Sequence, residues 1–197
     1  MTGLRIPDPA QRGDLAVFVE RALRLDRTAV IRLRVRADGL IGAWVSTGFD
    51  VLAGRVVAGH TASSDVTCAA GELLAGLESA DESGNVSSGQ AVDSAWRGAL
   101  PPETGFVHLD DVPAAVLDEL AGRGSELALD SEVLRVSSDD DSVGIPMRCV
   151  LTLAAMGFTP AAEGEVVRVR TLRNWLRIDA RYGSVFRRRG ASSLLVV

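Results

Sequence analysis

Residues 31–39 read Ile-Arg-Leu-Arg-Val-Arg-Ala-Asp-Gly, an alternation of aliphatic and arginine side chains that ends in an Asp-Gly pair. Successive side chains of a strand point to opposite faces, so Ile31, Leu33 and Val35 are expected on a buried face and the arginines on the other. An Asp-Gly pair after such a run indicates a tight hairpin turn. The stretch therefore predicts an antiparallel hairpin that continues into residues 40–45.

The segments on either side of this hairpin complete an N-terminal α+β module. Asp8-Pro9-Ala10-Gln11 has the order of a capping box, and the apolar residues that follow keep helical spacing: Leu15, Phe18, Val19, Ala22 and Leu25. A third strand is expected over residues 51–60 and a second helix over residues 72–77. The predicted module is a helix, a three-stranded antiparallel sheet and a further helix.

The C-terminal part of the chain shows a similar mixture of elements. A short strand is predicted at residues 105–109, and Asp110-Asp111-Val112-Pro113 reads as the start of a helix that glycines stop. Residues 125–136 are ambiguous. A helix over residues 146–156 is apolar on nearly every side and is expected to be the buried centre of its module. An arginine-rich hairpin (165–170 and 175–179) and a strand (183–188) follow.

A polar stretch of small residues separates the two groups of elements. Because residues 79–94 contain only two large apolar side chains, Val86 and Val92, they cannot build a core and favour a linker. We therefore predict an N-terminal α+β module (1–80), a linker (81–94) and a C-terminal α+β module (95–197). In both modules a helix leads into a hairpin, with Trp44 or Trp175 on its second strand and Gly48 or Gly183 before the third. This suggests a duplication, although the order is common enough for coincidence to be favoured.

Composition limits the class of protein. The 197 residues are 47% hydrophobic with a net charge of −5, which indicates a folded protein without a generally polyanion-binding surface. Cys68 and Cys149 lie in apolar surroundings and read as buried, reduced thiols, and no apolar stretch is long enough to span a membrane. The expected location is the cytoplasm. All 21 basic side chains are arginine, so chemistry that needs a lysine, including Schiff bases, is excluded.

The distribution of charge is the strongest non-random feature. Residues 101–144 carry two arginines and eleven acidic residues, whereas residues 145–197 carry nine arginines and three acidic residues, a charge of +6. One interpretation is an arginine-lined sheet surface that binds anions or a partner, formed by Arg168, Arg170, Arg173, Arg177, Arg187, Arg188 and Arg189. The interpretation that we favour is that these arginines pair with the acidic segment before them or with a partner subunit.

Other candidate sites are weaker. Three consecutive aspartates, Asp139 to Asp141, diverge rather than converge on a cation and are expected to form a solvated turn. His60 and His108, the two histidines, have no evident nucleophile or further metal ligands beside them. The sequence therefore predicts no catalytic residue, no metal and no cofactor.

Several short segments carry a resemblance to a known group of proteins. The chain resembles conserved proteins of mycobacterial and rhodococcal actinobacteria, through Trp96-Arg97-Gly98, Asp111-Val112-Pro113, Gly144-Ile145-Pro146, Ala155-Met156-Gly157-Phe158 and Tyr182-Gly183-Ser184. That resemblance implies no particular activity and brings no functional residue.

We therefore expect a non-catalytic binding or assembly protein that associates with itself or with another protein and not with a membrane. A nucleic-acid-associated regulator is the alternative, because a helix before an arginine-rich hairpin is also the order of a winged-helix DNA-binding domain. An enzyme without a recognisable motif is the third hypothesis.

Overall fold

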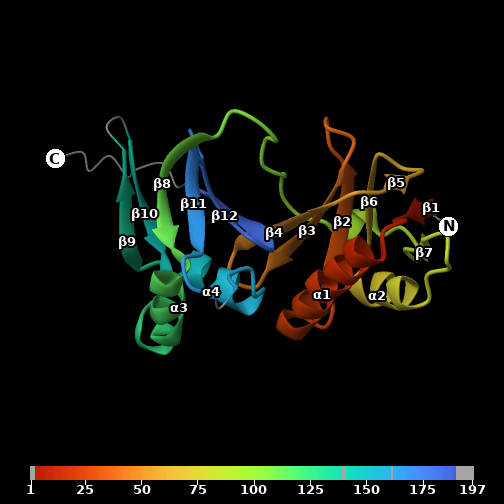
Figure 1. The fold of residues 1–197 in the computed structure, drawn as a ribbon, viewed down its shortest axis with the longest axis horizontal. Helices are drawn as coiled ribbons and strands as arrows, with labels where there is room; N and C mark the ends of the chain where they lie inside the picture. Colours follow the sequence, from red (N-terminus) through yellow and green to blue (C-terminus); the bar gives the residue numbers. More distant parts are fainter. Residues whose placement is uncertain (1–2, 139–140, 161, 190–197) are drawn as a thin grey trace. The chain divides into compact units, whose positions relative to one another are not determined.

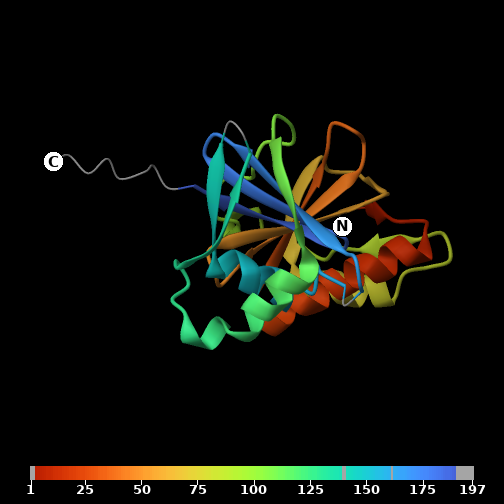
Figure 2. The same ribbon diagram turned by 60° about the vertical axis from the view of Figure 1, so that its left-hand side comes forward.

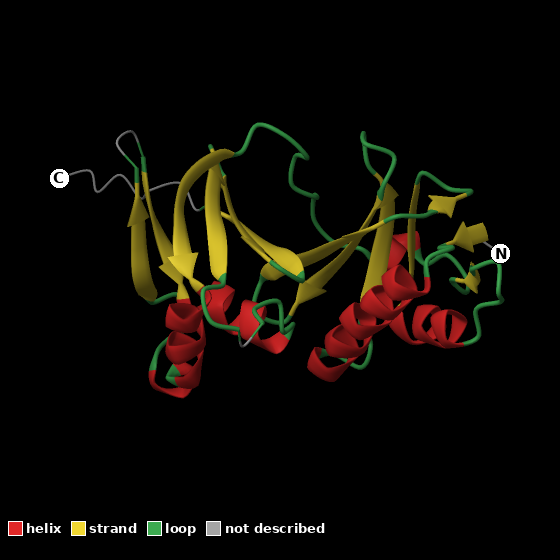
Figure 3. Ribbon diagram, in the orientation of Figure 1, coloured by secondary structure: helices red, strands yellow, loops and turns green. Residues whose placement is uncertain are grey.

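The computed structural model describes residues 3–138, 141–160 and 162–189. These residues form two compact units, each with two α-helices and antiparallel strands (Figures 1 and 3). Unit 1 contains residues 1–48 and 52–103, and unit 2 contains residues 49–51 and 104–197. The α+β class predicted from the sequence is confirmed, although each main sheet has four strands within its unit where three were expected.

Unit 1 holds its helices against a sheet whose order is β6-β2-β3-β4. A smaller sheet has the order β5-β1-β7. The elements are β1 (Gly3–Arg5), α1 (Pro9–Leu25), β2 (Val30–Val35), β3 (Ile41–Thr47), β4 (Val51–Val57), β5 (His60–Thr61), β6 (Asp65–Ala69), α2 (Ala70–Glu78) and β7 (Asn85–Ser87). A 3₁₀ turn, η1 (Asp93–Ala95), follows.

Unit 2 has a sheet of order β13-β12-β11-β8 and a separate hairpin, β9-β10. Figure 2 shows α3 and α4 together on one side of these strands. The elements are β8 (Val107–Pro113), α3 (Ala114–Gly122), η2 (Gly124–Glu126), β9 (Glu132–Ser137), β10 (Ser142–Pro146), α4 (Met147–Ala155), β11 (Val166–Leu172), β12 (Trp175–Ala180) and β13 (Gly183–Arg188).

The hairpin predicted from residues 31–45 forms as β2 and β3. Ile31 and Leu33 are fully buried, whereas Val35, expected on the same face, is half-buried. Of the arginines, Arg34 is exposed and Arg32 and Arg36 are half-buried. Gly39 adopts a positive φ of 81° in the turn, a conformation that glycine reaches without steric cost. The alternation therefore specifies which face of the strand enters the core.

The first helix begins where its sequence predicts. Asp8 is the N-cap of α1, and its carboxylate accepts a hydrogen bond from the backbone N–H of Ala10 at 2.9 Å. Gln11 does not complete a reciprocal capping box, because its side-chain oxygen accepts instead from the N–H of Ala58, at 3.1 Å. The side chain expected to cap the helix thus connects it to the residues that follow β4.

The prediction of a buried helix at residues 146–156 is confirmed by α4. Leu153 is 1% exposed, and Met147, Cys149 and Val150 are buried with it. Cys68 of unit 1 is buried as well, and neither cysteine is in a disulfide. Burial raises the pKa of both thiols to about 12. The cysteines therefore act as small apolar side chains of the two cores.

Two sequence predictions are corrected by the structure. Asp110 and Asp111 do not cap a helix, because β8 continues through both residues to Pro113 and α3 starts without a side-chain cap. Residues 81–94 also differ from the expected linker. Within them β7 pairs with β1, and the N–H of Gln90 donates to Glu72 of α2 at 2.9 Å. A polar segment thus folds onto unit 1 through its backbone, and the boundary between the units falls at 103/104.

The two units repeat one layout in reversed chain order. In unit 1 a long half, β1-α1-β2-β3-β4, comes before a short half, β6-α2-β7; in unit 2 the short half, β8-α3-β9, comes before the long half, β10-α4-β11-β12-β13. The pairings correspond: β6 with β2 matches β8 with β11, and β1 with β7 matches β10 with β9. One backbone hydrogen bond at the start of the short half's helix also recurs. It runs from Ala70 N to Ala29 O at 2.9 Å in unit 1 and from Ala114 N to Glu165 O at 2.8 Å in unit 2.

In this correspondence, the equivalent residues of the two units differ from those that the sequence suggested. Arg32 of β2 takes the place of Arg168 of β11, within the similar runs Val-Ile-Arg-Leu-Arg and Val-Val-Arg-Val-Arg. The two tryptophans are not equivalent, because Trp44 opposes Arg32 whereas Trp175 opposes Leu172. The arginine alternation is therefore the repeated feature, and the shared tryptophan is incidental.

None of the helices in the described part of the chain is long and apolar enough to cross a membrane. The sequence ends in four apolar residues, Leu194 to Val197, which are unfavourable in water. They predict that the tail docks on its own sheet or on a neighbouring subunit, and they lie outside the described residues.

Candidate functional site: the arginines of unit 2

The seven arginines singled out in the sequence do not share one surface. Strand alternation places the side chains of Val167, Val169 and Ile178 in the core, so the residues between them point to the other side of the sheet. We call that side the arginine face; its arginines are Arg168, Arg170, Arg177 and Arg188.

The remaining three arginines of the predicted set lie elsewhere. Arg187 is in register with buried Leu176, so it belongs to the opposite side of the sheet. Arg189 follows β13 and contacts the β9-β10 hairpin, where it donates to Ser142 O at 3.3 Å. Arg173 is in the turn between β11 and β12, with a φ of 38°.

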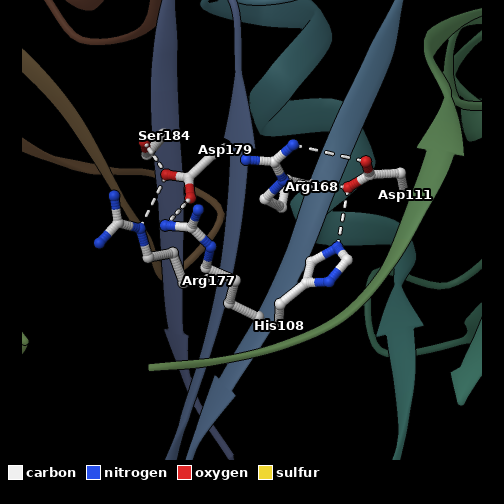
Figure 4. Close-up of polar contacts among 7 residues, drawn as sticks. His108, Asp111, Arg168, Arg177, Asp179 and Ser184 are labelled. Atoms are coloured by element: carbon white, nitrogen blue, oxygen red, sulfur yellow. Dashed lines mark hydrogen bonds and ion pairs between the residues drawn. The ribbon is translucent and has the colours of Figure 1, made fainter. Parts of the chain in front are cut away.

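Asp179 is the centre of the arginine face (Figure 4). Its Oδ1 accepts from Arg177 Nε at 2.7 Å and from Ser184 Oγ at 2.5 Å, and its Oδ2 lies 3.1 Å from Arg170 Nη1. The side chains of Asp179, Arg177 and Arg170 are only 19%, 20% and 28% exposed. One carboxylate is therefore shared by two half-buried guanidinium groups.

A second ion pair on the same face involves a histidine. Asp111 Oδ1 lies 3.1 Å from Arg168 Nε and 2.9 Å from His108 Nε2, so one oxygen is shared by both partners (Figure 4). The hydrogen bond from Arg168, and then that from His108, hold the pKa of Asp111 below its usual value. The structure therefore brings His108 next to an acid that an arginine also contacts.

Aromatic rings contact two guanidinium groups of the arginine face. Arg177 lies 5.5 Å from the ring centre of Phe106 and 5.2 Å from that of Phe186. Arg188 lies 5.4 Å from the ring centre of Trp175, which makes a cation-π pair. Arg188 has no carboxylate partner among the residues that the structure describes.

A cavity of about 440 Å³ is lined by residues of β12, of β13 and of the β9-β10 hairpin. We call it the arginine pocket. Its charged lining residues are Asp130, Glu132, Arg135, Arg187, Arg188 and Arg189.

Unit 1 has a counterpart of the Arg168 pair. Arg32 donates from Nε and Nη2 to the two carboxylate oxygens of Asp65, at 2.7 and 2.6 Å. The same guanidinium lies 5.6 Å from the ring centre of Trp96. A smaller cavity, of about 280 Å³, is lined by Arg32, Asp65, Asp93 and Trp96. In each unit the equivalent arginine is thus neutralised by an acid of the neighbouring strand, which is Asp65 of β6 in unit 1 and Asp111 of β8 in unit 2.

The other candidate sites of the sequence are the run of three aspartates and the two histidines. Asp139 and Asp140 lie outside the described residues, while Asp141 accepts from Thr171 Oγ1 at 3.0 Å and pairs with Arg189 at 3.3 Å. His60 is exposed in unit 1, whereas His108 is in unit 2. The described residues contain no group of three or more His, Cys, Asp or Glu side chains suited to a metal ion.

Sequence reasoning missed the residues that organise the site. Asp179 was read only as the end of a strand, although its spacing of two from Arg177 placed both side chains on one face. Asp111 was read as a helix cap. Phe106 and Phe186 gave no signal, because they lie 80 residues apart in the sequence and meet only in the folded unit.

Solved structures with a similar fold are DNA polymerase sliding clamps. The chain aligns with the clamp of Bacillus subtilis at a TM-score of 0.60 and 12% identity, covering 95% of this chain and 64% of that one. The DNA polymerase III beta chain of Streptococcus pneumoniae gives the same values, and the beta subunit of Pseudomonas aeruginosa gives a TM-score of 0.58 at 12% identity. The chain thus spans 64% of the length of these relatives, and the likeness concerns the fold.

No curated protein matches the chain. Two family models do: residues 1–98 match a domain of unknown function, DUF8010, and residues 101–192 match a second, DUF8185. Their boundary agrees with the division of the structure at 103/104 to within a few residues. The chain is thus a tandem of these two domains, with a sliding-clamp-like fold, and fits a family of unknown function.

Proposed function

We propose that this protein is a non-catalytic, clamp-like assembly protein that associates with itself or with a protein partner. The observation that carries the proposal is the likeness to sliding clamps, which extends over 95% of the chain and therefore includes both units. Those relatives are described as subunits of a DNA polymerase, that is, as parts of a larger assembly. Unpaired cysteines in both units support a cytoplasmic location, where thiols stay reduced.

The ion pairs of the arginine face support the same proposal. Arg168, Arg170 and Arg177 each have a carboxylate partner, and Asp111 comes from the acidic segment that the charge layout had suggested. Guanidinium groups held in this way stiffen a surface and present it in one arrangement. The face is therefore suited to contact with a folded protein.

Self-association is tested by sedimentation equilibrium of the full chain over a hundredfold range of concentration. We expect a mass that is a multiple of the 20.8 kDa chain. A monomer at every concentration, combined with the absence of any protein captured by the purified chain from its own host, would contradict the proposal.

Nucleic-acid binding is the second candidate, because the similar structures are clamps of DNA polymerases and residues 145–197 carry a charge of +6. The hairpin β11-β12 gives it little support as a winged-helix motif, since both of its strands are flanked within the sheet, by β8 and β13. The helices also lack a basic surface: within the described residues, α1, α2, α3 and α4 carry four arginines against six carboxylates.

An electrophoretic mobility assay with duplex and single-stranded DNA separates the two candidates. A phosphate-binding surface gives an affinity that falls steeply with salt, with a log-log slope close to the number of phosphates contacted. We expect no shift even at low salt. Tight binding that Arg170→Ala and Arg177→Ala abolish, with thermal stability intact, would reverse the order of the candidates.

A further inference from the structure

The arginine pocket gathers positive charge in a protein that is acidic overall. Arg135 comes from β9, Arg187 from β13, and Arg189 from the residue after β13. Leu176, Val143 and Pro146 contribute apolar surface between these groups. Apart from Arg188, whose guanidinium group stacks on Trp175, three arginines and two acidic residues line the cavity, against a charge of −5 for the whole chain. The local excess of guanidinium groups points to an anionic ligand.

The carboxylates that accompany these arginines are mostly exposed to solvent. The side chain of Asp130, the partner of Arg187 at 2.8 Å, is 67% exposed, and that of Glu132, which Arg135 contacts at 2.6 Å, is 43% exposed. Ion pairs between exposed groups contribute little, because solvent and salt screen them. Their arginines can therefore turn to a ligand at small cost.

The guanidinium groups themselves are better shielded than their partners. Arg187 and Arg189 are each 28% exposed, and the partner of Arg189, Asp141, is 3.3 Å away and is also engaged by Thr171. Asp130 is likewise shared, since Arg148 contacts it at 2.8 Å. Asp130 thus offers one negative charge to two guanidinium groups, so Arg187 keeps capacity for an anion, and the 3.3 Å separation of Arg189 from Asp141 makes that ion pair the weaker one.

We infer that the arginine pocket binds a small phosphate-bearing anion, with Arg135, Arg187 and Arg189 as its guanidinium donors. Planar guanidinium groups match phosphate oxygens in pairs, and three of them from two sides of one cavity suit a compact, multiply charged group better than a single carboxylate. The cavity has the size of a small-molecule site and is too limited for a folded partner. This inference goes beyond the proposed assembly function and does not depend on it.

The test is calorimetric titration of the full-length protein with inorganic pyrophosphate, at constant ionic strength set with NaCl. We expect saturable binding with one site per chain. Arg135→Ala should weaken it about tenfold, since it removes a charge-assisted interaction. Arg135 is suited to this substitution because its side chain is 59% exposed, so the variant is expected to fold.

Arg123→Ala is the matched control. Arg123 also pairs with an acid three residues away, Glu126, and its side chain is 60% exposed, but it does not line the pocket. Unchanged affinity in this control, with weaker binding in Arg135→Ala, supports the inference. Absence of saturable binding, or equal weakening in the two variants, overturns it. Displacement of pyrophosphate at lower concentration by a polyglutamate peptide or an oligonucleotide would assign the pocket to a macromolecule and also overturn it.

Discussion

At the scale of single residues, Asp179 decides the character of the arginine face. It is the one acidic residue of the strands β11, β12 and β13, and it contacts two arginines and a serine. Removing one partner of a half-buried ion pair leaves a charge without compensation, which costs more than the pair itself contributes. Asp179 is therefore a structural residue that offsets the repulsion between two adjacent guanidinium groups.

Replacement of Asp179 by asparagine should lower the free energy of unfolding by about 2 kcal/mol or more, because Arg170 and Arg177 would remain half-buried without an anion. Chemical denaturation measures the change. Glu119→Gln is the control, since this exposed residue of α3 should alter stability by less than about 0.5 kcal/mol. Equal stability of the two variants would show that the arginines do not need Asp179.

Asp111 should make part of the folding stability depend on pH. Its pKa in the folded protein is lowered by Arg168 and then by His108, so the ionised form favours folding. This contribution is complete above the unfolded pKa, about 4, and is lost as the pH falls through the lower folded value. Wild type and Asp111→Asn should therefore converge in stability below about pH 4 and differ at pH 6. A gap that stays constant with pH would contradict the assignment.

At the scale of elements, strand alternation was predictable and the partners of the outward side chains were not. The pattern of Ile31 and Leu33 fixed the buried face of β2, and the apolar residues of α4 fixed a buried helix. The neighbours of Arg168 depend on β8, which pairs with β11 across more than 50 residues of chain. Local periodicity carries no information on such a pairing, so Asp110 and Asp111 were mistaken for a cap.

The packing of α2 on β7 gives a test of the segment that was mistaken for a linker. A Cβ on Gly76 would lie 1.8 Å from the carbonyl oxygen of Ser87, whereas a Cβ on Gly71 of the same helix would have no atom within 4 Å. Alanine favours a helix over glycine by up to about 1 kcal/mol. Gly71→Ala should therefore be neutral or stabilising.

Gly76→Ala should be destabilising, because the gain in helix propensity is outweighed by displacement of the β7 backbone. Thermal unfolding of the two variants beside wild type compares the two effects. Equal melting temperatures for Gly71→Ala and Gly76→Ala would mean that residues 85–87 do not pack on α2.

At the scale of the whole molecule, the two units share a layout that the chain traverses in opposite order. The sequence showed the longer half of each unit, because a helix followed by a hairpin and a strand leaves local signals. The shorter halves, β6-α2-β7 and β8-α3-β9, were incompletely predicted because their strands pair with distant ones. The pocket and the ion pairs of unit 2 follow from those long-range pairings, so only their arginines could be named beforehand.

Each unit contains one buried thiol, which gives a separate reporter of its integrity. Burial raises the pKa of Cys68 and of Cys149 to about 12, so at pH 8 only about 1 thiol in 10,000 is the reactive thiolate. In Cys149→Ala and Cys68→Ala, the remaining thiol should therefore be unreactive toward a disulfide reagent in buffer. It should react only when urea unfolds the unit that holds it. The absorbance of the thiolate released from the reagent measures this reaction. Rapid labelling of Cys68 in buffer, with Cys149 protected, would show that unit 1 opens locally while unit 2 stays folded.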